Sequence, residues 1–231
     1  MIHKVVSGPE EAVKDIFDGA TVMVGGFGGS GLPVTLIKAL REQGSKNLTI
    51  VANNVGGVQY SVGILIANQQ IRKVICSFPI GRRQARLQEA FWEQYRAGHL
   101  EVELVPQGTL AERIRAAGAG IPAFYTPTGV GTPLAAGKEL RTFDGRAHLL
   151  ELALKADFAL IKAYQGDRMG NLVYRKAMRN FNPMMAAAAN ITIAEVEGVV
   201  EAGDLDPEMI ATPGIYVDRV VEVKVERRWQ G

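Results

Sequence analysis

Short apolar segments alternate with amphipathic helical segments along most of this 231-residue chain. Strands are expected at residues 21–24, 48–51, 74–76, 101–105, 158–161 and 191–194. Helices are expected at residues 9–17, from 33 onward, at 84–96 and at 109–117. Strand–helix alternation with nearly continuous apolar strands is typical of a parallel sheet that is buried on both faces. The predicted fold class is therefore α/β, with a mostly parallel sheet covered by helices on both faces.

A different pattern occupies the middle of the chain. Residues 119–137 are rich in Gly, Pro and Thr and predict a long loop, which in a compact domain is usually functional or mobile. Asp144-Gly145 then lies between two segments, 139–143 and 147–150, and predicts a short hairpin insertion. The sequence contains no internal repeat, linker or low-complexity segment, so one domain over residues 1–231 is expected.

The composition excludes several classes of partner. The formal net charge is only +2 and no block of like charge stands out, so neither nucleic acid nor a membrane surface is expected to bind. No stretch approaches the roughly 20 apolar residues of a membrane span. The single cysteine, Cys76, lies in an apolar segment and predicts a buried, unreactive thiol. A reducing compartment, and hence a cytoplasmic location, is expected.

The glycine-rich segment 25–31 lies between an expected strand and an expected helix. Backbone N–H groups and a helix start can bind an anion there, although a tight turn without a ligand explains the same composition. Gly26, Gly28 and Gly31 match the dinucleotide pattern G-x-G-x-x-G. However, Asn53 and Asn54 stand where that fold needs an acid for the ribose. An NAD-dependent oxidoreductase is therefore only a minor alternative.

A longer pattern around these glycines carries a family resemblance. Asp18-Gly19, the apolar residues 22–24, Gly25-Gly26-Phe27, Gly31 and Pro33 resemble the N-terminal signature of the family I coenzyme A transferases. Similar motifs recur across residues 7–223, at 105–116, 121–125 and 174–177. Within the family the chain is most similar to the A subunits of succinyl-CoA:3-oxoacid and 3-oxoadipate CoA-transferases.

The motifs do not all favour one acid substrate. Residues 76–79, 205–208 and 212–215 are most similar to the 3-oxoadipate branch. The segment from Arg82 to Trp92 matches neither branch, and its function is not assigned. Both 3-oxoadipate and acetoacetate therefore stay open as the acceptor.

The resemblance implies a ping-pong reaction in which a glutamate attacks an acyl-CoA and then carries CoA as a thioester. In the family this glutamate lies in a Ser-Glu-Asn-Gly motif of the B subunit, and this chain has no similar motif. The resemblance thus implies a hetero-oligomer with a B subunit that acts on succinyl-CoA and a 3-oxo acid. The CoA thioester is a substrate, so no cofactor and no metal are expected. A transferase-like binding module without catalysis of its own is the alternative.

The resemblance also assigns site residues. Gln107 would donate a hydrogen bond to the oxyanion of the transition state, although it could instead cap a helix that starts at Thr109. Gly28, Gly29 and Ser30 would lie near the glutamate of the partner and the acyl group. Asn53 and Asn54 could hold the substrate carboxylate or simply form a turn.

Several other side chains have two interpretations. Arg175 and Lys176 could meet an acidic substrate or the CoA phosphates, or could lie on a solvated face. Tyr125, at the rim of the long loop, could likewise belong to the site or to the surface. Phe27 is expected to fill the core rather than to contact the substrate. The acids at helix starts and helix surfaces are expected to be solvated or capping, and they are Glu10, Glu11, Glu112 and Glu208.

Overall fold

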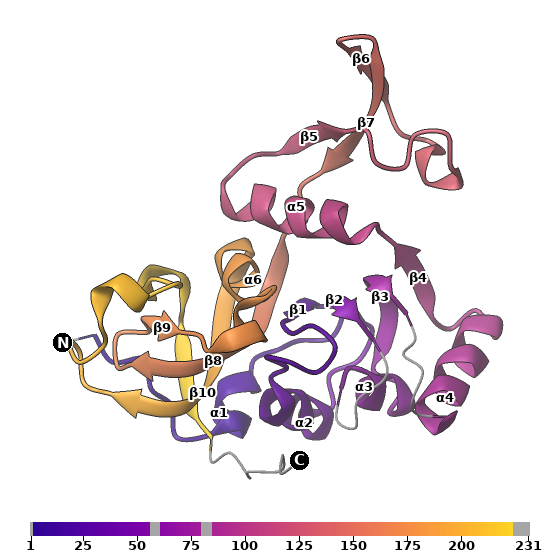
Figure 1. Ribbon diagram of the computed structural model, residues 1–231. Coiled ribbons are helices and arrows are strands. Elements are labelled where there is room, and N and C mark those ends of the chain that lie inside the picture. The colour runs from indigo at the N-terminus through magenta and orange to yellow at the C-terminus, as the bar shows by residue number, and fades with distance from the viewer. Residues whose placement is uncertain (1, 56–60, 80–84, 224–231) are drawn as a thin grey trace.

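The computed structural model describes residues 2–55, 61–79 and 85–223, and its main feature is an eight-stranded sheet (Figure 1). The strand order is β11-β10-β8-β1-β2-β3-β4, and β9 pairs with β8. Every pairing along this order is parallel, and only β9 is antiparallel to its neighbour. The strands are β1 (Thr21–Val24), β2 (Leu48–Asn54), β3 (Ile71–Phe78), β4 (Glu101–Leu104), β8 (Ala156–Asp167), β9 (Leu172–Val173), β10 (Ala189–Val200) and β11 (Arg219–Glu222). The prediction of a mostly parallel sheet is confirmed.

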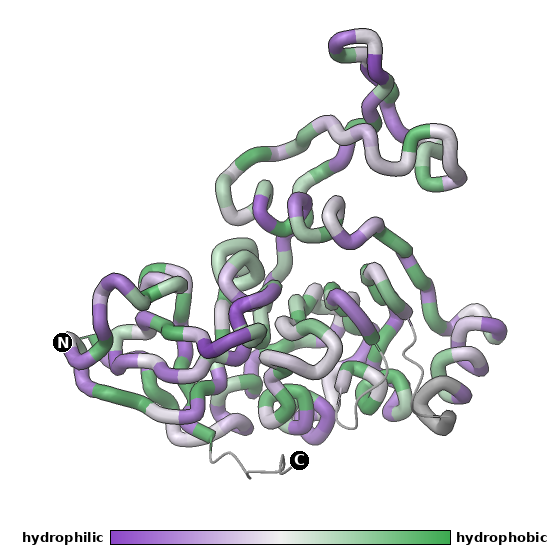
Figure 2. Tube along the Cα trace, in the orientation of Figure 1, coloured by the Kyte–Doolittle hydropathy of each residue, from purple (hydrophilic) through white to green (hydrophobic). Residues whose placement is uncertain are grey.

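Helices cover both faces of this sheet, as predicted (Figure 1). One face packs against α1 (Pro9–Val13), α2 (Val34–Gln43), α3 (Gly63–Ala67) and α4 (Ala85–Arg96). The other packs against α5 (Gln107–Gly118) and α6 (Asn182–Ala188). Successive strand residues point to opposite faces, so Val22 and Val24 join the first core while Met23 joins the second. Figure 2 shows the corresponding hydrophobic segments along the central strands.

A small antiparallel sheet projects from the α5 side of the molecule (Figure 1). It consists of β5 (Ala123–Thr126), β7 (Arg146–Leu152) and β6 (Leu140–Phe143), in that order. The predicted hairpin is confirmed as β6 and β7, but the prediction of one long loop at 119–137 is wrong. That segment contains β5 and the 3-10 helix η1 (Pro133–Ala135). β5 is stabilised by pairing with β7, a contact between residues distant in sequence that local composition does not reveal.

Some element boundaries differ from the sequence predictions. α1 ends at Val13, four residues before the expected end, while α5 begins at Gln107, two residues before Thr109. The predicted buried position of Cys76 is confirmed, and burial raises the pKa of its thiol to about 12. Gln84, the expected start of α4, lies outside the described residues. The division into one domain stays a prediction.

Candidate active site at the carboxyl edge of the sheet

A continuous chain of amide hydrogen bonds crosses the carboxyl edge of the sheet. Gln107 Nε2 donates to Asn53 Oδ1 at 2.6 Å, and Asn53 Nδ2 donates to Asn54 Oδ1 at 3.1 Å. The same Asn54 oxygen accepts from the backbone N–H of Gly28 at 3.1 Å. Four of the residues that the sequence singled out therefore meet at one place, although they come from the glycine loop, β2 and α5.

The backbone N–H of Gly28 fixes the direction of this chain, because a backbone N–H can only donate. Asn54 must then present its oxygen to Gly28, so Asn53 approaches that oxygen with its nitrogen. Asn53 in turn presents its oxygen to Gln107, whose Nε2 must donate. Among the described residues the Gln107 amide makes no second hydrogen bond. One N–H of Gln107 therefore has its orientation fixed by the protein and is left over for a ligand.

The glycine loop forms a closed turn beside this chain. Phe27 and Ser30 exchange two backbone hydrogen bonds with N···O distances of 3.0 and 2.9 Å. Gly28 and Gly29 lie between them with φ of +59° and +106°, a backbone region that side chains rarely adopt. The turn is exposed, as a ligand contact requires. Phe27 is 49% exposed, so the prediction that it fills the core is wrong, because the turn stands out beyond the end of β1.

The helix start after the glycine loop is already occupied by a side chain of the protein. The carboxylate of Glu195 on β10 accepts from the backbone N–H groups of Thr35 and Leu36 at 2.8 and 3.1 Å. Lys162 Nζ donates to the same carboxylate at 2.9 Å. Burial raises the pKa of Glu195, and these three donors oppose that rise. A dinucleotide phosphate at the start of α2 would lose these donors and meet a carboxylate, so the geometry disfavours the NAD alternative.

Two asparagines that the sequence analysis did not single out hold the other side of the glycine loop. Asn180 Nδ2 donates to Ser30 O at 2.9 Å, and Asn182 Nδ2 donates to Gly31 O at 3.0 Å. They follow the 3-10 helix η2 (Lys176–Arg179), about 150 residues away from the loop in sequence. The only local signal for them is Asn182-Pro183, which marks a helix start.

Ser77 and Thr109 carry buried hydroxyls. Ser77, which follows Cys76 on β3, is beside Asn53 in the parallel register of β2 and β3, and Thr109 lies two residues after Gln107 in α5. Neither hydroxyl has a hydrogen-bond partner within the part of the chain that is described. Buried polar groups are normally paired, so the Ser77 hydroxyl beside Asn53 has hydrogen-bonding capacity that the described residues do not use.

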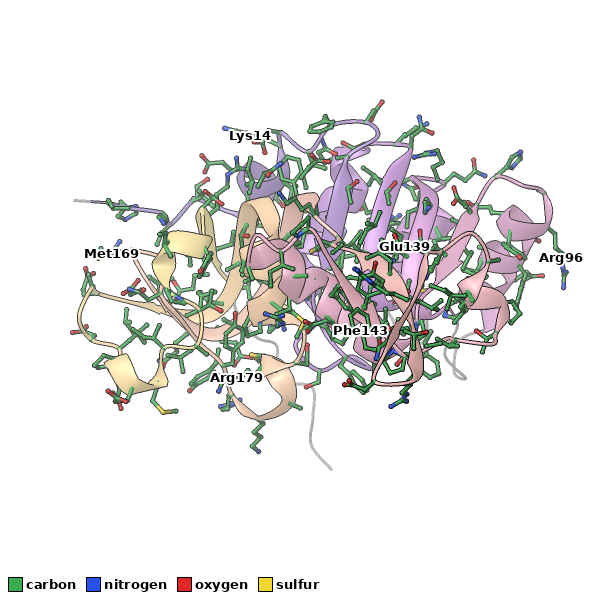
Figure 3. The ribbon with its side chains drawn as sticks, turned by 90° about the horizontal axis from the view of Figure 1, so that it is seen from above. Lys14, Arg96, Glu139, Phe143, Met169 and Arg179 are labelled. Carbon is green, nitrogen blue, oxygen red and sulfur yellow. The ribbon has the colours of Figure 1, made fainter. Side chains whose placement is uncertain are left out.

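The remaining candidate residues lie elsewhere or have local partners. Arg175 stacks over the Tyr164 ring at 4.4 Å and lies 3.9 Å from Glu197. Tyr125, on the small sheet, hydrogen-bonds to Glu139. Figure 3 labels Phe143 on β6 of this small sheet, Glu139 directly before β6, and Arg179 at the end of η2. These local contacts explain Arg175 and Tyr125 without a ligand, and Lys176 is exposed on η2.

The surface acids also lie where the sequence placed them. Glu11 accepts two hydrogen bonds from Ser7 at the start of α1, and Glu112 pairs with Arg115 on α5. Glu10 and Glu208 are exposed. No helix among residues 2–55, 61–79 and 85–223 has both the length and the apolar character to cross a membrane.

The comparisons with known proteins agree with this fold and with the sequence motifs. The model of the coenzyme A transferase family matches residues 6–223. The chain is 56% identical over 223 residues to the A subunit of the 3-oxoadipate CoA-transferase of Pseudomonas putida, covering 96% of this chain and 95% of that protein. It is 53% identical over 218 residues to the A subunit of the succinyl-CoA:3-ketoacid coenzyme A transferase of Xanthomonas campestris pv. campestris (strain B100), covering 92% and 88%.

The chain therefore belongs to the coenzyme A transferase family. Its fold is similar to that of the acyl-CoA transferase YdiF apoenzyme from Escherichia coli O157:H7, with a TM-score of 0.82 at 23% identity. The match covers 99% of this chain but only 48% of YdiF, so the chain spans about half the length of that polypeptide.

Proposed function

We propose that this chain is the A subunit of a two-subunit CoA-transferase that moves coenzyme A from succinyl-CoA to a 3-oxo acid. The two relatives above are each named as an A subunit, and their names give succinyl-CoA with a 3-keto acid in one case and 3-oxoadipate in the other. Their identities to this chain differ by only three percentage points, 56% against 53%, so both 3-oxoadipate and acetoacetate are candidate acceptors.

The reaction needs a nucleophile that this chain does not supply. In the proposed sequence a glutamate of the B subunit, in its Ser-Glu-Asn-Gly motif, attacks the thioester carbonyl and releases CoA thiolate, which leaves a mixed anhydride. The thiolate then attacks the glutamyl carbonyl and releases succinate, which leaves CoA on the glutamate as a thioester. The 3-oxo acid reverses both steps and departs as its CoA thioester.

The N–H of Gln107 that no described residue accepts is the observation that carries the proposal. Each attack places negative charge on a carbonyl oxygen, and a donor whose orientation is already fixed stabilises that charge without reorganising. Asn53 supplies this fixed orientation through its 2.6 Å hydrogen bond to Gln107. We assign Gln107 as the oxyanion donor, with Gly28, Gly29 and Ser30 beside the acyl group. Asn54 has no partner for its Nδ2 among the described residues and is suited to hold a substrate carboxylate together with Asn53.

The surface beside the site fits the arrival of a second polypeptide. Phe27 is 49% exposed and Phe78, which pairs with Asn54 in the strand register, is 59% exposed. Large exposed aromatic side chains are enriched where proteins associate. The half-length match to YdiF also leaves room for a second half of the active unit.

Assays with and without the B subunit test the proposal. The purified chain alone is expected to show no CoA transfer from succinyl-CoA to acetoacetate or 3-oxoadipate. Addition of a partner with the Ser-Glu-Asn-Gly motif is expected to restore transfer to at least one of these acids. Robust transfer by the isolated chain would contradict the proposal that the B subunit supplies the nucleophile. No transfer with either acid in an assembled pair would favour the non-catalytic binding module.

A further inference from the structure

Asn182 is a fully buried side chain, and its amide hydrogen bonds join the glycine loop to β8 and η2. Its Nδ2 donates to Gly31 O at 3.0 Å and to Met178 O at 2.8 Å, and its Oδ1 accepts from the backbone N–H of Lys162 at 3.0 Å. A buried amide with three such bonds costs free energy to disturb, because each lost partner leaves a buried polar group unpaired.

Two glycines of the loop leave room for this side chain. A Cβ added at Gly25 would lie 1.8 Å from Asn182 Oδ1, and one added at Gly31 would lie 2.7 Å from Asn182 Nδ2. Both distances are below 3.0 Å, the limit under which neighbouring atoms must shift to admit a Cβ. Gly25 and Gly31 lie on either side of the exposed turn from Phe27 to Ser30, so one asparagine packs against both ends of that turn.

Asn180 provides a second attachment for the same turn. It is partly exposed, and its Nδ2 donates to Ser30 O at 2.9 Å and to Ala177 O at 2.6 Å. Its Oδ1 accepts from the backbone N–H of Phe181 at 2.6 Å, which fixes its orientation. The turn is thus held by Asn180 and Asn182 on one side and by the Asn54 bond to Gly28 on the other.

We infer that Asn180 and Asn182 are positioning residues for the transfer reaction, acting through the glycine turn. This inference rests on the proposed function, in which the turn borders the acyl group and the glutamate of the B subunit. A turn with successive positive-φ glycines has unusual backbone freedom, and an error of about 1 Å in such a position can cost about 100-fold in rate. The segment that begins at Tyr174-Arg175-Lys176 thereby gains a role as the support that places the two asparagines.

The test uses the assembled A–B complex and a control that matches Asn182 in burial and bonding. Gln70 is also fully buried, and its amide makes three hydrogen bonds, to Leu40 O, Ser45 O and Asn68, but it precedes β3 at the opposite edge of the sheet. Asn182→Ala is expected to lower kcat about 10- to 100-fold with little change in KM for succinyl-CoA. Gln70→Ala is expected to lower Tm comparably and to leave kcat near the wild-type value.

Asn180→Ala keeps the inference testable if Asn182→Ala does not fold, because Asn180 is partly exposed and its loss should cost little stability. Its expected effect is a smaller fall in kcat, on the order of 3- to 10-fold, with Tm nearly unchanged. The inference is overturned if the wild-type complex is active while Asn180→Ala and Asn182→Ala both keep the kcat of Gln70→Ala. If Asn182→Ala fails to fold, Asn180→Ala with the kcat of Gln70→Ala overturns the inference by itself. An inactive wild-type complex would instead overturn the proposed function, and the inference with it.

Discussion

The two edges of the main sheet use the same kinds of side chain for different purposes. At the amino edge, Gln70 donates to Leu40 O and Ser45 O, and Asp157 on β8 accepts from the N–H of Thr21 at the start of β1. At the carboxyl edge, the amide chain that ends at Gln107 leaves one N–H of Gln107 without a partner among the described residues. The hydrogen bonds of the amino edge stabilise the fold, whereas those of the carboxyl edge orient groups that remain available to a ligand.

This difference explains why buried amides alone do not identify a site. Gln70 and Asn53 are both buried, and both make hydrogen bonds to distant parts of the chain. What distinguishes Asn53 is that its partner, Gln107, has an N–H that no described residue accepts, near an exposed glycine turn. The carboxyl ends of parallel strands are also where ligands bind in open α/β sheets.

The largest effect is expected at the carboxyl edge, from Gln107→Ala. Removal of one oxyanion donor typically costs about 2.7–4 kcal/mol in barrier, so kcat of the A–B complex should fall about 100- to 1,000-fold. Because Gln107 is partly exposed at the start of α5, its loss should scarcely change folding. Steady-state kinetics with a parallel thermal melt measure both quantities. Near-normal turnover would remove Gln107 from the mechanism and weaken the contrast between the edges.

At the amino edge the expected effect is on stability and not on rate. Gln70→Ala leaves the buried Ser45 O without a donor among the described residues, which costs about 1–3 kcal/mol, while Leu40 O keeps its bond from the N–H of Gly44 at 3.2 Å. Urea unfolding should show a lower midpoint with an unchanged m value. A clear loss of kcat at a temperature well below Tm would show that a change at the amino edge affects the site at the carboxyl edge.

An intermediate effect is expected from Asn53→Ala, which removes the acceptor that orients Gln107 but leaves Gln107 in place. A freed Gln107 amide samples other orientations, so kcat should fall about tenfold, equivalent to about 1.4 kcal/mol. The double variant Asn53→Ala/Gln107→Ala sharpens the interpretation. If Asn53 acts through Gln107, the double variant should be no slower than Gln107→Ala, and strictly additive losses would show that Asn53 acts independently.

The smallest effect is expected from an ion pair at the amino edge. Both guanidinium arms of Arg219 donate to Asp15 at 2.6 Å, and this hydrogen bonding lowers the pKa of the Asp15 carboxyl. Its stabilisation is therefore present above the unfolded-state pKa and is lost as the pH falls through the lower folded-state value. Asp15 is substantially exposed, so Asp15→Asn should cost at most about 1 kcal/mol at neutral pH.

Denaturant unfolding as a function of pH measures the difference in the free energy of unfolding between the wild type and Asp15→Asn. This difference should vanish in acid. The surface pair of Arg41 and Glu42, 3.6 Å apart, offers a control, since Glu42→Gln should leave stability unchanged at every pH. A loss for Asp15→Asn that persists unchanged in acid would show that packing, and not charge, is responsible.

Local patterns in the sequence were sufficient for much of the fold but not for its long-range pairings. The sequence predicts the strand at residues 21–24 correctly because it is a short apolar segment with glycines near both ends. Local sequence does not predict β5, which depends on pairing with β7, or β11, which depends on pairing with β10. Local sequence also does not predict the burial of Glu195, because its partners, the start of α2 and Lys162, lie more than 30 residues away in sequence.

The candidate site, like the fold, can be predicted from the sequence only in part. Gln107, Asn53 and the glycines were found from a family resemblance and from their places at strand ends. Their hydrogen-bonded chain could not be predicted, because it joins residues 26 and 54 positions apart. Asn180 and Asn182 were missed because their bonds to the glycine loop span about 150 residues, and asparagine near a helix start is unremarkable in any sequence.

The central claim is that this chain orients the reacting groups while the attacking carboxylate comes from another polypeptide. The direct measurement is to mix the A–B complex with succinyl-CoA without an acceptor acid, quench it, and locate the CoA thioester by peptide mass spectrometry. The predicted result is an adduct on the glutamate of the Ser-Glu-Asn-Gly motif in the B subunit, with none on this chain. A CoA thioester on any side chain of this polypeptide would contradict the claim.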